Sequence, residues 1–139
     1  MRHLQQMRLH PRQQATFDLF PDYQHLLSAQ AEVGPAFAVI RDRIVWCAFG
    51  ALELCPGMAE AWMLRDDRID TYTIPLARNA LAFFDVLGTD MALRRCQITV
   101  QVAFKSAVRF AKWVGFEVEG VLRNYGVTHD DHYMMARYY

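Results

Sequence analysis

The feature of this sequence that most constrains its fold is the stretch KSAVRFAKWVGFEVEGVLRNYG, residues 105–126. Apolar residues recur in it with the steps of three and four that place side chains on one face of a helix: Ala107, Phe110, Ala111 and Val114. Gly115 follows, and glycine readily takes the left-handed conformation that ends a helix. The stretch therefore predicts a short helix that ends at a glycine and leads directly into a strand over 116–123.

The rest of the chain carries strand and helix patterns of ordinary length. Residues 2–8 are expected to form a strand, residues 10–20 a helix or a loop, and residues 21–31 a helix that ends near Gly34. Beyond residue 35, apolar runs and alternations predict strands over 36–40, 44–54, 58–64, 96–102, 116–123 and 133–139. A helix with Thr73 as its N-cap is expected between the third and fourth of these strands. Its apolar stripe and its glycine stop are Ala77, Ala80, Leu81, Phe84, Leu87 and Gly88.

The element order from residue 35 is β-β-β-α-β-α-β-β. This order predicts an α/β protein whose sheet is mixed, mostly antiparallel, and flanked by helices. No repeat, low-complexity tract or linker interrupts the sequence, so a single domain over residues 1–139 is expected.

The charge balance and the cysteines narrow the class of protein. Fifteen basic and fifteen acidic side chains give a net charge of zero, so we expect neither nucleic acid nor a membrane surface as a partner. The N-terminus lacks the apolar core of a signal peptide, and no run approaches the roughly 18 apolar residues of a membrane span. We therefore expect a cytoplasmic protein. Cys47, Cys55 and Cys96 show no C-x-x-C spacing, which favours free thiols over a disulfide framework or a zinc site.

Taken together, the element order and the stretch after residue 105 resemble the GNAT family of N-acetyltransferases. In that family the last helix commonly reads Asn-x-x-Ala-x-x-Leu-Tyr-x-x-x-Gly-Phe, and the next strand often begins Glu-x-x-Gly. The matching residues are Ala107, Arg109, Phe110, Gly115, Phe116, Glu117 and Gly120. The resemblance covers residues 35–139 and implies a GNAT-like fold. The chain is also similar to the small GNAT-like proteins of tailed podophages, which are internal virion or accessory proteins.

The resemblance implies acetyl-CoA as a cofactor and a set of residues to hold it. The strand backbone at Trp62, Met63 and Leu64 would pair with the pantetheine arm. Three arginines of the following stretch would bind the phosphates: Arg65, Arg68 and Arg78. Glu60 would serve as the general base that deprotonates an amine, with Glu53 as a weaker candidate. A solvent-facing strand glutamate is the simpler alternative for both.

The stretch that should grip the pyrophosphate departs from the family pattern. Family members carry a glycine-rich loop there, because glycines let backbone amides at a helix N-terminus approach the anion. Residues 65–81 contain no glycine, and Pro75 removes one of the first free amides of the helix. Asp66, Asp67 and Asp70 would repel the phosphates. An ordinary exposed loop of mixed charge is the alternative interpretation of this stretch.

Two reactive positions of the family's last helix are also changed. Counting back from Gly115, the position of the family's tyrosine holds Ala111, and that of its asparagine holds Phe104. Alanine cannot protonate a leaving thiolate, and phenylalanine offers no amide to the pantetheine arm. The helix thus keeps the family's packing residues and loses its reactive ones.

A polar turn near the C-terminus raises the question of a metal. The side chains of His129–His132, in the order HDDH, suit a metal, but four adjacent residues of a tight turn seldom converge on one ion, so no metal is expected.

The leading hypothesis is a phage-type accessory protein with degenerate acetyl-CoA machinery, which binds a host or virion protein in the host cytoplasm. The alternative is an active, divergent N-acetyltransferase that moves an acetyl group from acetyl-CoA to an amine.

Overall fold

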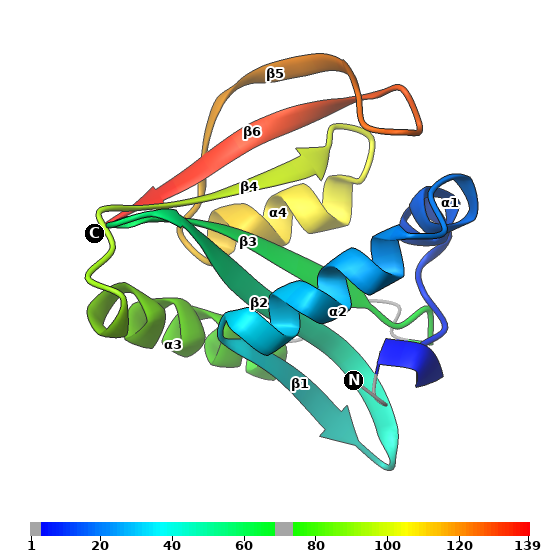
Figure 1. Ribbon diagram of the computed structural model, residues 1–139, viewed down its shortest axis with the longest axis horizontal. Helices are drawn as coiled ribbons and strands as arrows, with labels where there is room; N and C mark the ends of the chain where they lie inside the picture. The colour runs from blue at the N-terminus through cyan, green and yellow to red at the C-terminus, as the bar shows by residue number, and fades with distance from the viewer. Residues whose placement is uncertain (1–3, 69–73) are drawn as a thin grey trace. The chain divides into compact units, whose positions relative to one another are not determined.

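The computed structural model describes residues 4–68 and 74–139. Within them it has a 3₁₀ helix, four α-helices and six strands (Figure 1). The helices are η1 (Leu4–Gln6), α1 (Pro11–Leu19), α2 (Tyr23–Val33), α3 (Ile74–Asp90) and α4 (Lys105–Trp113). The strands are β1 (Ala36–Arg41), β2 (Ile44–Cys55), β3 (Met58–Arg65), β4 (Arg95–Gln101), β5 (Glu117–Tyr125) and β6 (Asp130–Tyr138).

The strands follow one another in the sheet as β1-β2-β3-β4-β6-β5. β3 and β4 pair in parallel, through Met58↔Arg95, Ala59↔Cys96 and Glu60↔Gln97. The pairs β1–β2, β4–β6 and β5–β6 are antiparallel. The predicted fold class, an α/β chain with a mixed, mostly antiparallel sheet and flanking helices, is confirmed.

The start of the chain differs from the expectation. The strand predicted over 2–8 is wrong in its described part, because Leu4–Gln6 forms η1. Leu4 and Met7 are three residues apart, a spacing that a 3₁₀ turn places on one side, and both line a cavity. The N-cap predicted at Thr73 lies outside the described residues.

The contacts within the chain divide it into two compact units. The N-terminal unit comprises residues 1–52 and 61–70, and the C-terminal unit residues 53–60 and 71–139. The turn between β2 and β3 therefore belongs to the C-terminal unit, whereas most of β2 and the end of β3 belong to the N-terminal unit. The single domain expected over residues 1–139 stays a prediction.

The C-terminal unit has an aromatic core between α3 and the end of α4. Figure 1 shows α4 beside β4, with β5 and β6 as a long hairpin. The rings of Phe84 on α3 and Phe116 after α4 meet edge to face, with centroids 5.1 Å apart. The expected burial is confirmed for Ala80, Phe84 and Val114. Leu81, Ala107 and Phe110, expected to be buried, are only partly covered.

Two glycines of this unit have different reasons to be glycine. Gly115 has φ +100°, the left-handed conformation expected where α4 stops. Gly88, expected as a helix stop, lies inside α3, which continues to Asp90, so that prediction is wrong. A Cβ at Gly88 would lie 2.1 Å from the ring of Tyr139, whose hydroxyl donates to the Phe84 carbonyl at 2.9 Å. Gly88 is therefore a packing residue that lets the C-terminus dock on α3.

The N-terminal unit packs β2 and α2 around small and apolar side chains. Cys47, Ala48, Phe49 and Ala51 of β2 are buried, as is Leu27 of α2.

Of the three cysteines, Cys47 and Cys96 are buried and Cys55 is exposed. Burial raises the pKa of the Cys47 and Cys96 thiols to about 12, so both stay protonated and unreactive at neutral pH. None of the helices in the described part of the chain is long and apolar enough to cross a membrane.

Candidate functional site

The side chain of Gln13, on α1, is bonded to one edge of β3 near the end of that strand. The Asp66 N–H donates to the carbonyl of Trp46 on β2, at 2.9 Å. Because successive residues of a strand direct their backbone groups to opposite sides, Met63 and Arg65 present theirs at the edge away from β2. There the Nε2 of Gln13 donates to the Met63 carbonyl at 2.7 Å, and its Oε1 accepts from the Arg65 N–H at 2.9 Å. The side-chain amide of Gln13 thus takes the place of a neighbouring strand.

The main chain before α1 continues this contact. The His10 N–H donates to the Arg65 carbonyl at 3.1 Å, and the Arg8 carbonyl accepts from the Asp67 N–H at 2.5 Å. We call residues 8–13 the strap. The strap therefore bonds to the end of β3 through backbone groups at two points and through the Gln13 side chain.

Asp66 anchors the residues that follow β3. Its side chain is 0% exposed, and its carboxylate accepts from the N–H groups of Arg8 and Arg68, each at 3.0 Å. The guanidinium of Arg68 adds two bonds of 2.7 Å, from Nε to Oδ1 and from Nη2 to Oδ2. These side-chain bonds lower the pKa of Asp66 from 3.8 to about 2, although burial alone would raise it. Asp66 is consequently a fully bonded buried carboxylate at neutral pH.

The three arginines predicted to hold phosphates are not alike in the structure. Arg65 is 3% exposed, so its guanidinium lies inside the N-terminal unit. Arg68 directs its guanidinium to Asp66, as described above. Arg78 is exposed on α3 in the C-terminal unit. Their role toward phosphates stays a prediction. Arg68 and Arg78 are both exposed, and of the two Arg68 is paired with a carboxylate.

The backbone predicted to pair with pantetheine is similarly engaged. Met63 gives its carbonyl to Gln13, and Leu64 is buried. Trp62 is partly buried against Gly50, and its indole N–H is buried without a hydrogen-bond partner among the described residues. A pantetheine arm would therefore compete with Gln13 for the edge of β3.

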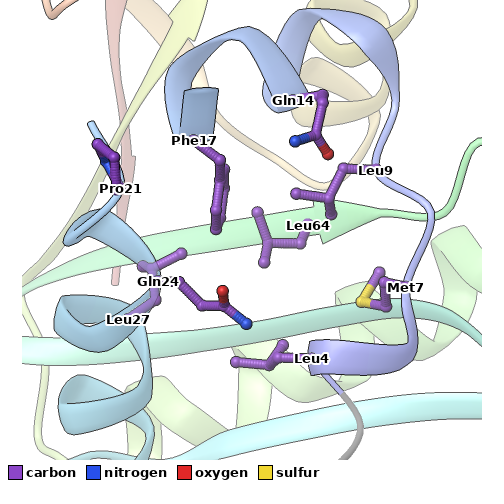
Figure 2. Close-up of a pocket in the computed structure, with 9 residues that line it drawn as sticks. All are labelled: Leu4, Met7, Leu9, Gln14, Phe17, Pro21, Gln24, Leu27 and Leu64. Atoms are coloured by element: carbon purple, nitrogen blue, oxygen red, sulfur yellow. The ribbon is translucent and has the colours of Figure 1, made fainter. Parts of the chain in front are cut away.

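A cavity of about 300 Å³ lies beside the strap in the N-terminal unit. Figure 2 shows Phe17 pointing from α1 toward Leu64 of β3, with Gln24 and Leu27 of α2 below them. The lining residues are Leu4, Met7, Leu9, Gln14, Phe17, Pro21, Gln24, Leu27 and Leu64. None of them carries a charge, so the cavity suits an uncharged group and supplies no general acid or base.

The predicted general base belongs to a row of polar side chains in the C-terminal unit. Glu60 is partly buried, and its Oε2 accepts from the Nε2 of Gln97 at 3.0 Å. The Oε1 of Gln97 in turn accepts from the Nε of Arg95 at 3.3 Å. Arg95 makes two bonds to Glu119, of 2.7 and 2.6 Å, and Glu119 also accepts from the hydroxyl of Tyr138. The row joins β3, β4, β5 and β6 in one hydrogen-bonded chain.

This row gives Glu60 a fixed orientation but leaves its role open. Because Arg95 donates to Gln97, the amide of Gln97 must present its NH₂ group to Glu60. One oxygen of Glu60 is thereby held, and the other remains an acceptor, which is what a general base needs. Sequence reasoning missed Gln97, although its alternation with Arg95 along β4 placed both on one face of a strand. Glu53, the weaker candidate, is exposed.

The two changed positions of α4 lie in the core. Ala111 is buried on α4, and Phe104, directly before the helix, is buried too. Neither side chain has an acidic proton or an amide to offer.

In the C-terminal turn, His129 bonds to the side chain of Asn124 at 3.0 Å. In the described part of the chain, no three His, Cys, Asp or Glu side chains come together as a metal site.

Comparison with known proteins defines the fold class. No family model and no curated protein matches the sequence. Solved structures do match it, and they are acetyltransferases with the GNAT fold. The fold of this chain is therefore the GNAT fold, whereas identities of 19% or lower extend the likeness no further than the fold.

Three of these structures illustrate the match. An IAA acetyltransferase from Bacillus cereus has a TM-score of 0.71 at 10% identity, covering 94% of this chain and 93% of the other. A GNAT family acetyltransferase from Elizabethkingia anophelis, with acetyl-CoA bound, has 0.69 at 7% identity, covering 89% and 88%. A GNAT family acetyltransferase from Streptococcus pneumoniae has 0.63 at 19% identity, covering 82% and 72%.

Proposed function

We propose that this chain is an accessory protein of the phage type, built on an acetyltransferase fold, that acts by binding a host or virion protein. On this proposal its acetyl-CoA machinery is degenerate. One observation carries the proposal. The guanidinium of Arg68, a predicted phosphate ligand, is paired with the buried carboxylate of Asp66 through two hydrogen bonds. A phosphate held by its remaining N–H groups would have to share this guanidinium with a buried carboxylate of like charge, which weakens its hold on the phosphate.

The other parts of the predicted cofactor site support the same proposal. Arg65 is buried, the Met63 carbonyl is bonded to Gln13, and the stretch before α3 has no glycine. Ala111 and Phe104 stand at the family's reactive positions. A protein that acts by binding needs none of these groups, because its fold alone presents the surface.

The alternative function is transfer of an acetyl group from acetyl-CoA to an amine. The orientation of Glu60 by Gln97 favours it, since a carboxylate with one free oxygen can accept a proton from an ammonium group. Glu60 would then be the base, with the backbone at Trp62, Met63 and Leu64 on the pantetheine arm. The phosphates would be bound by Arg65, Arg68 and Arg78. Acetyl-CoA is the ligand that this function requires, and one structure with this fold contains it.

The two functions separate in an experiment on wild type and Glu60→Gln. Each protein is incubated with labelled acetyl-CoA and a panel of amines, and each is also used as bait for host and virion proteins. We expect no acetyl transfer above the level of Glu60→Gln, and the same partner retained in equal amount by both baits. Transfer that Glu60→Gln abolishes would establish the enzyme and refute the proposal.

A further inference from the structure

We propose that Gln13 is an internal ligand of β3, whose side-chain amide fills a site for one N–H donor and one carbonyl acceptor that an outside molecule enters only when the strap leaves. We call its bonds to the Met63 carbonyl and the Arg65 N–H the Gln13 latch. The inference goes beyond the proposed function, because it concerns access to the edge of β3 and holds whether or not the chain transfers acetyl groups.

The geometry of the latch is that of a strand pair. A strand edge offers a carbonyl at one residue and an N–H two residues later, and a neighbouring backbone satisfies both. A carboxamide carries one acceptor and two donors on a planar group, so a single Gln can do the same. The edge at Met63 and Arg65 is therefore a site for one N–H donor and one carbonyl acceptor, and the primary carboxamide of Gln13 is its present occupant.

The strap is held mainly by these polar bonds, with Leu9 in the lining of the cavity as its apolar contact. None of the nine residues of α1 is buried, and a helix of this length is marginal without tertiary support. Its first N–H groups are capped by His10, whose Nδ1 accepts from the Arg12 N–H at 3.3 Å. Releasing the strap would thus expose few apolar groups, and the core around β2 and α2 would remain.

The ligand class follows from what the edge offers. A molecule with two successive amides in an extended chain can accept from the Arg65 N–H with one and donate to the Met63 carbonyl with the other, because the N–H and C=O of a single trans amide point in opposite directions. Both a pantetheine arm and an extended peptide meet this requirement. Pantetheine is the sharper probe, because it has amides and no phosphate, so its binding does not depend on Arg68 or Arg78.

The experiment compares wild type with Gln13→Ala, Gln13→Glu and Gln14→Ala. Gln13→Ala removes the latch. Gln13→Glu can still accept from the Arg65 N–H but cannot donate to the Met63 carbonyl, so it serves if the alanine variant folds poorly. Gln14→Ala is the matched control, because Gln14 is the next residue of the same helix and bonds to Asp18 and not to β3. Amide hydrogen exchange at Arg65 reports the latch, and titrations with pantetheine and with a blocked dipeptide report the site.

We expect the Arg65 amide to exchange faster in both Gln13 variants and unchanged in Gln14→Ala. Pantetheine should bind Gln13→Ala about tenfold more tightly than wild type or Gln14→Ala, since an occupied site lowers apparent affinity by its free fraction. The same gain with the dipeptide in place of pantetheine also supports the amide site and identifies a peptide as its ligand. Equal affinity in all the proteins, or no binding of either probe, would overturn the proposal. Tight acetyl-CoA binding by wild type would refute the proposed function but not this one, unless Gln13→Ala left that affinity unchanged.

Discussion

The junction between α4 and β5 and the end of β3 are the two stretches where the family pattern is most specific, and they differ in what they keep. At the junction, Val114, Gly115 and Phe116 form the helix stop and the core contact with α3 that the pattern requires. At the end of β3, Asp66 and Gln13 bond to the groups that the pattern assigns to a cofactor. The comparison teaches that packing residues carry the fold, whereas two of the groups predicted to hold a ligand, the Met63 carbonyl and the Arg68 guanidinium, already have intramolecular partners.

Removing the aromatic contact at the junction between α4 and β5 should cause the largest loss of stability. Phe84→Ala leaves a cavity against Phe116, and we expect it to lower the free energy of unfolding by about 3–5 kcal/mol. Chemical denaturation measures this. Val86→Ala on the exposed side of the same helix is the control, with an expected change within about 0.5 kcal/mol. Equal losses in the two variants would contradict the assignment of the core.

Removing the charge of Asp66 at the end of β3 should cause a somewhat smaller loss of stability. Asp66→Asn leaves the donors of Arg8 and Arg68 without their carboxylate, and we expect a loss of about 2–4 kcal/mol. Asp67→Asn is the control, because Asp67 is partly exposed and its ion pair with Arg8 spans 3.8 Å. A loss no larger in Asp66→Asn than in Asp67→Asn would show that the buried pair is not an anchor.

Acid tests the same anchor without a variant. The pKa of Asp66 falls from 3.8 to about 2 on folding, so its stabilisation is complete above pH 4 and is lost as the pH falls through 2. The shift corresponds to at most about 2 kcal/mol. The difference in unfolding free energy between wild type and Asp66→Asn should shrink by that amount between pH 5 and pH 2. Parallel pH curves would contradict it.

Substitutions in the polar row around Glu60 should change the stability least. Arg95 and Glu119 are partly exposed, and the Arg95 guanidinium holds the pKa of Glu119 below its usual range. Such surface pairs contribute little to stability. We expect Glu119→Gln to leave the melting temperature within experimental error, and Gln97→Ala likewise. A clear destabilisation by either would mean that the row is part of the structural core.

The fold could be predicted from the sequence because its signals are local. The steps of three and four in α4, the left-handed Gly115 and the strand alternations each depend on neighbouring residues. Gly88 was misassigned because its reason is distant: the ring of Tyr139 is 51 positions further along the chain. The same holds for the start of the chain, where Leu4 and Met7 turn toward a cavity formed with α1, α2 and β3.

The candidate site was predictable in its residue types but not in its bonds. The sequence shows arginines and aspartates mixed at the end of β3 and directly after it, in the order RDDRID over residues 65–70. It does not show that Asp66 is buried and takes the guanidinium of Arg68, since a run of mixed charges usually lies in solvent. Gln13 had no signal at all, because its partners lie 50 and 52 residues away.

The measurement that tests the central claim most directly is the stabilisation of wild-type protein by acetyl-CoA. A competent site would stabilise the fold by about 2.7 kcal/mol at a hundredfold excess over Kd, which for a chain of this size raises the melting temperature by several degrees. Because Arg65 is buried, and Arg68 and the edge of β3 already have bonding partners, we predict no shift at micromolar acetyl-CoA. Any weak shift at higher concentration should depend on the exposed Arg68 or Arg78 and decrease with salt. A rise of several degrees at micromolar acetyl-CoA would contradict the account.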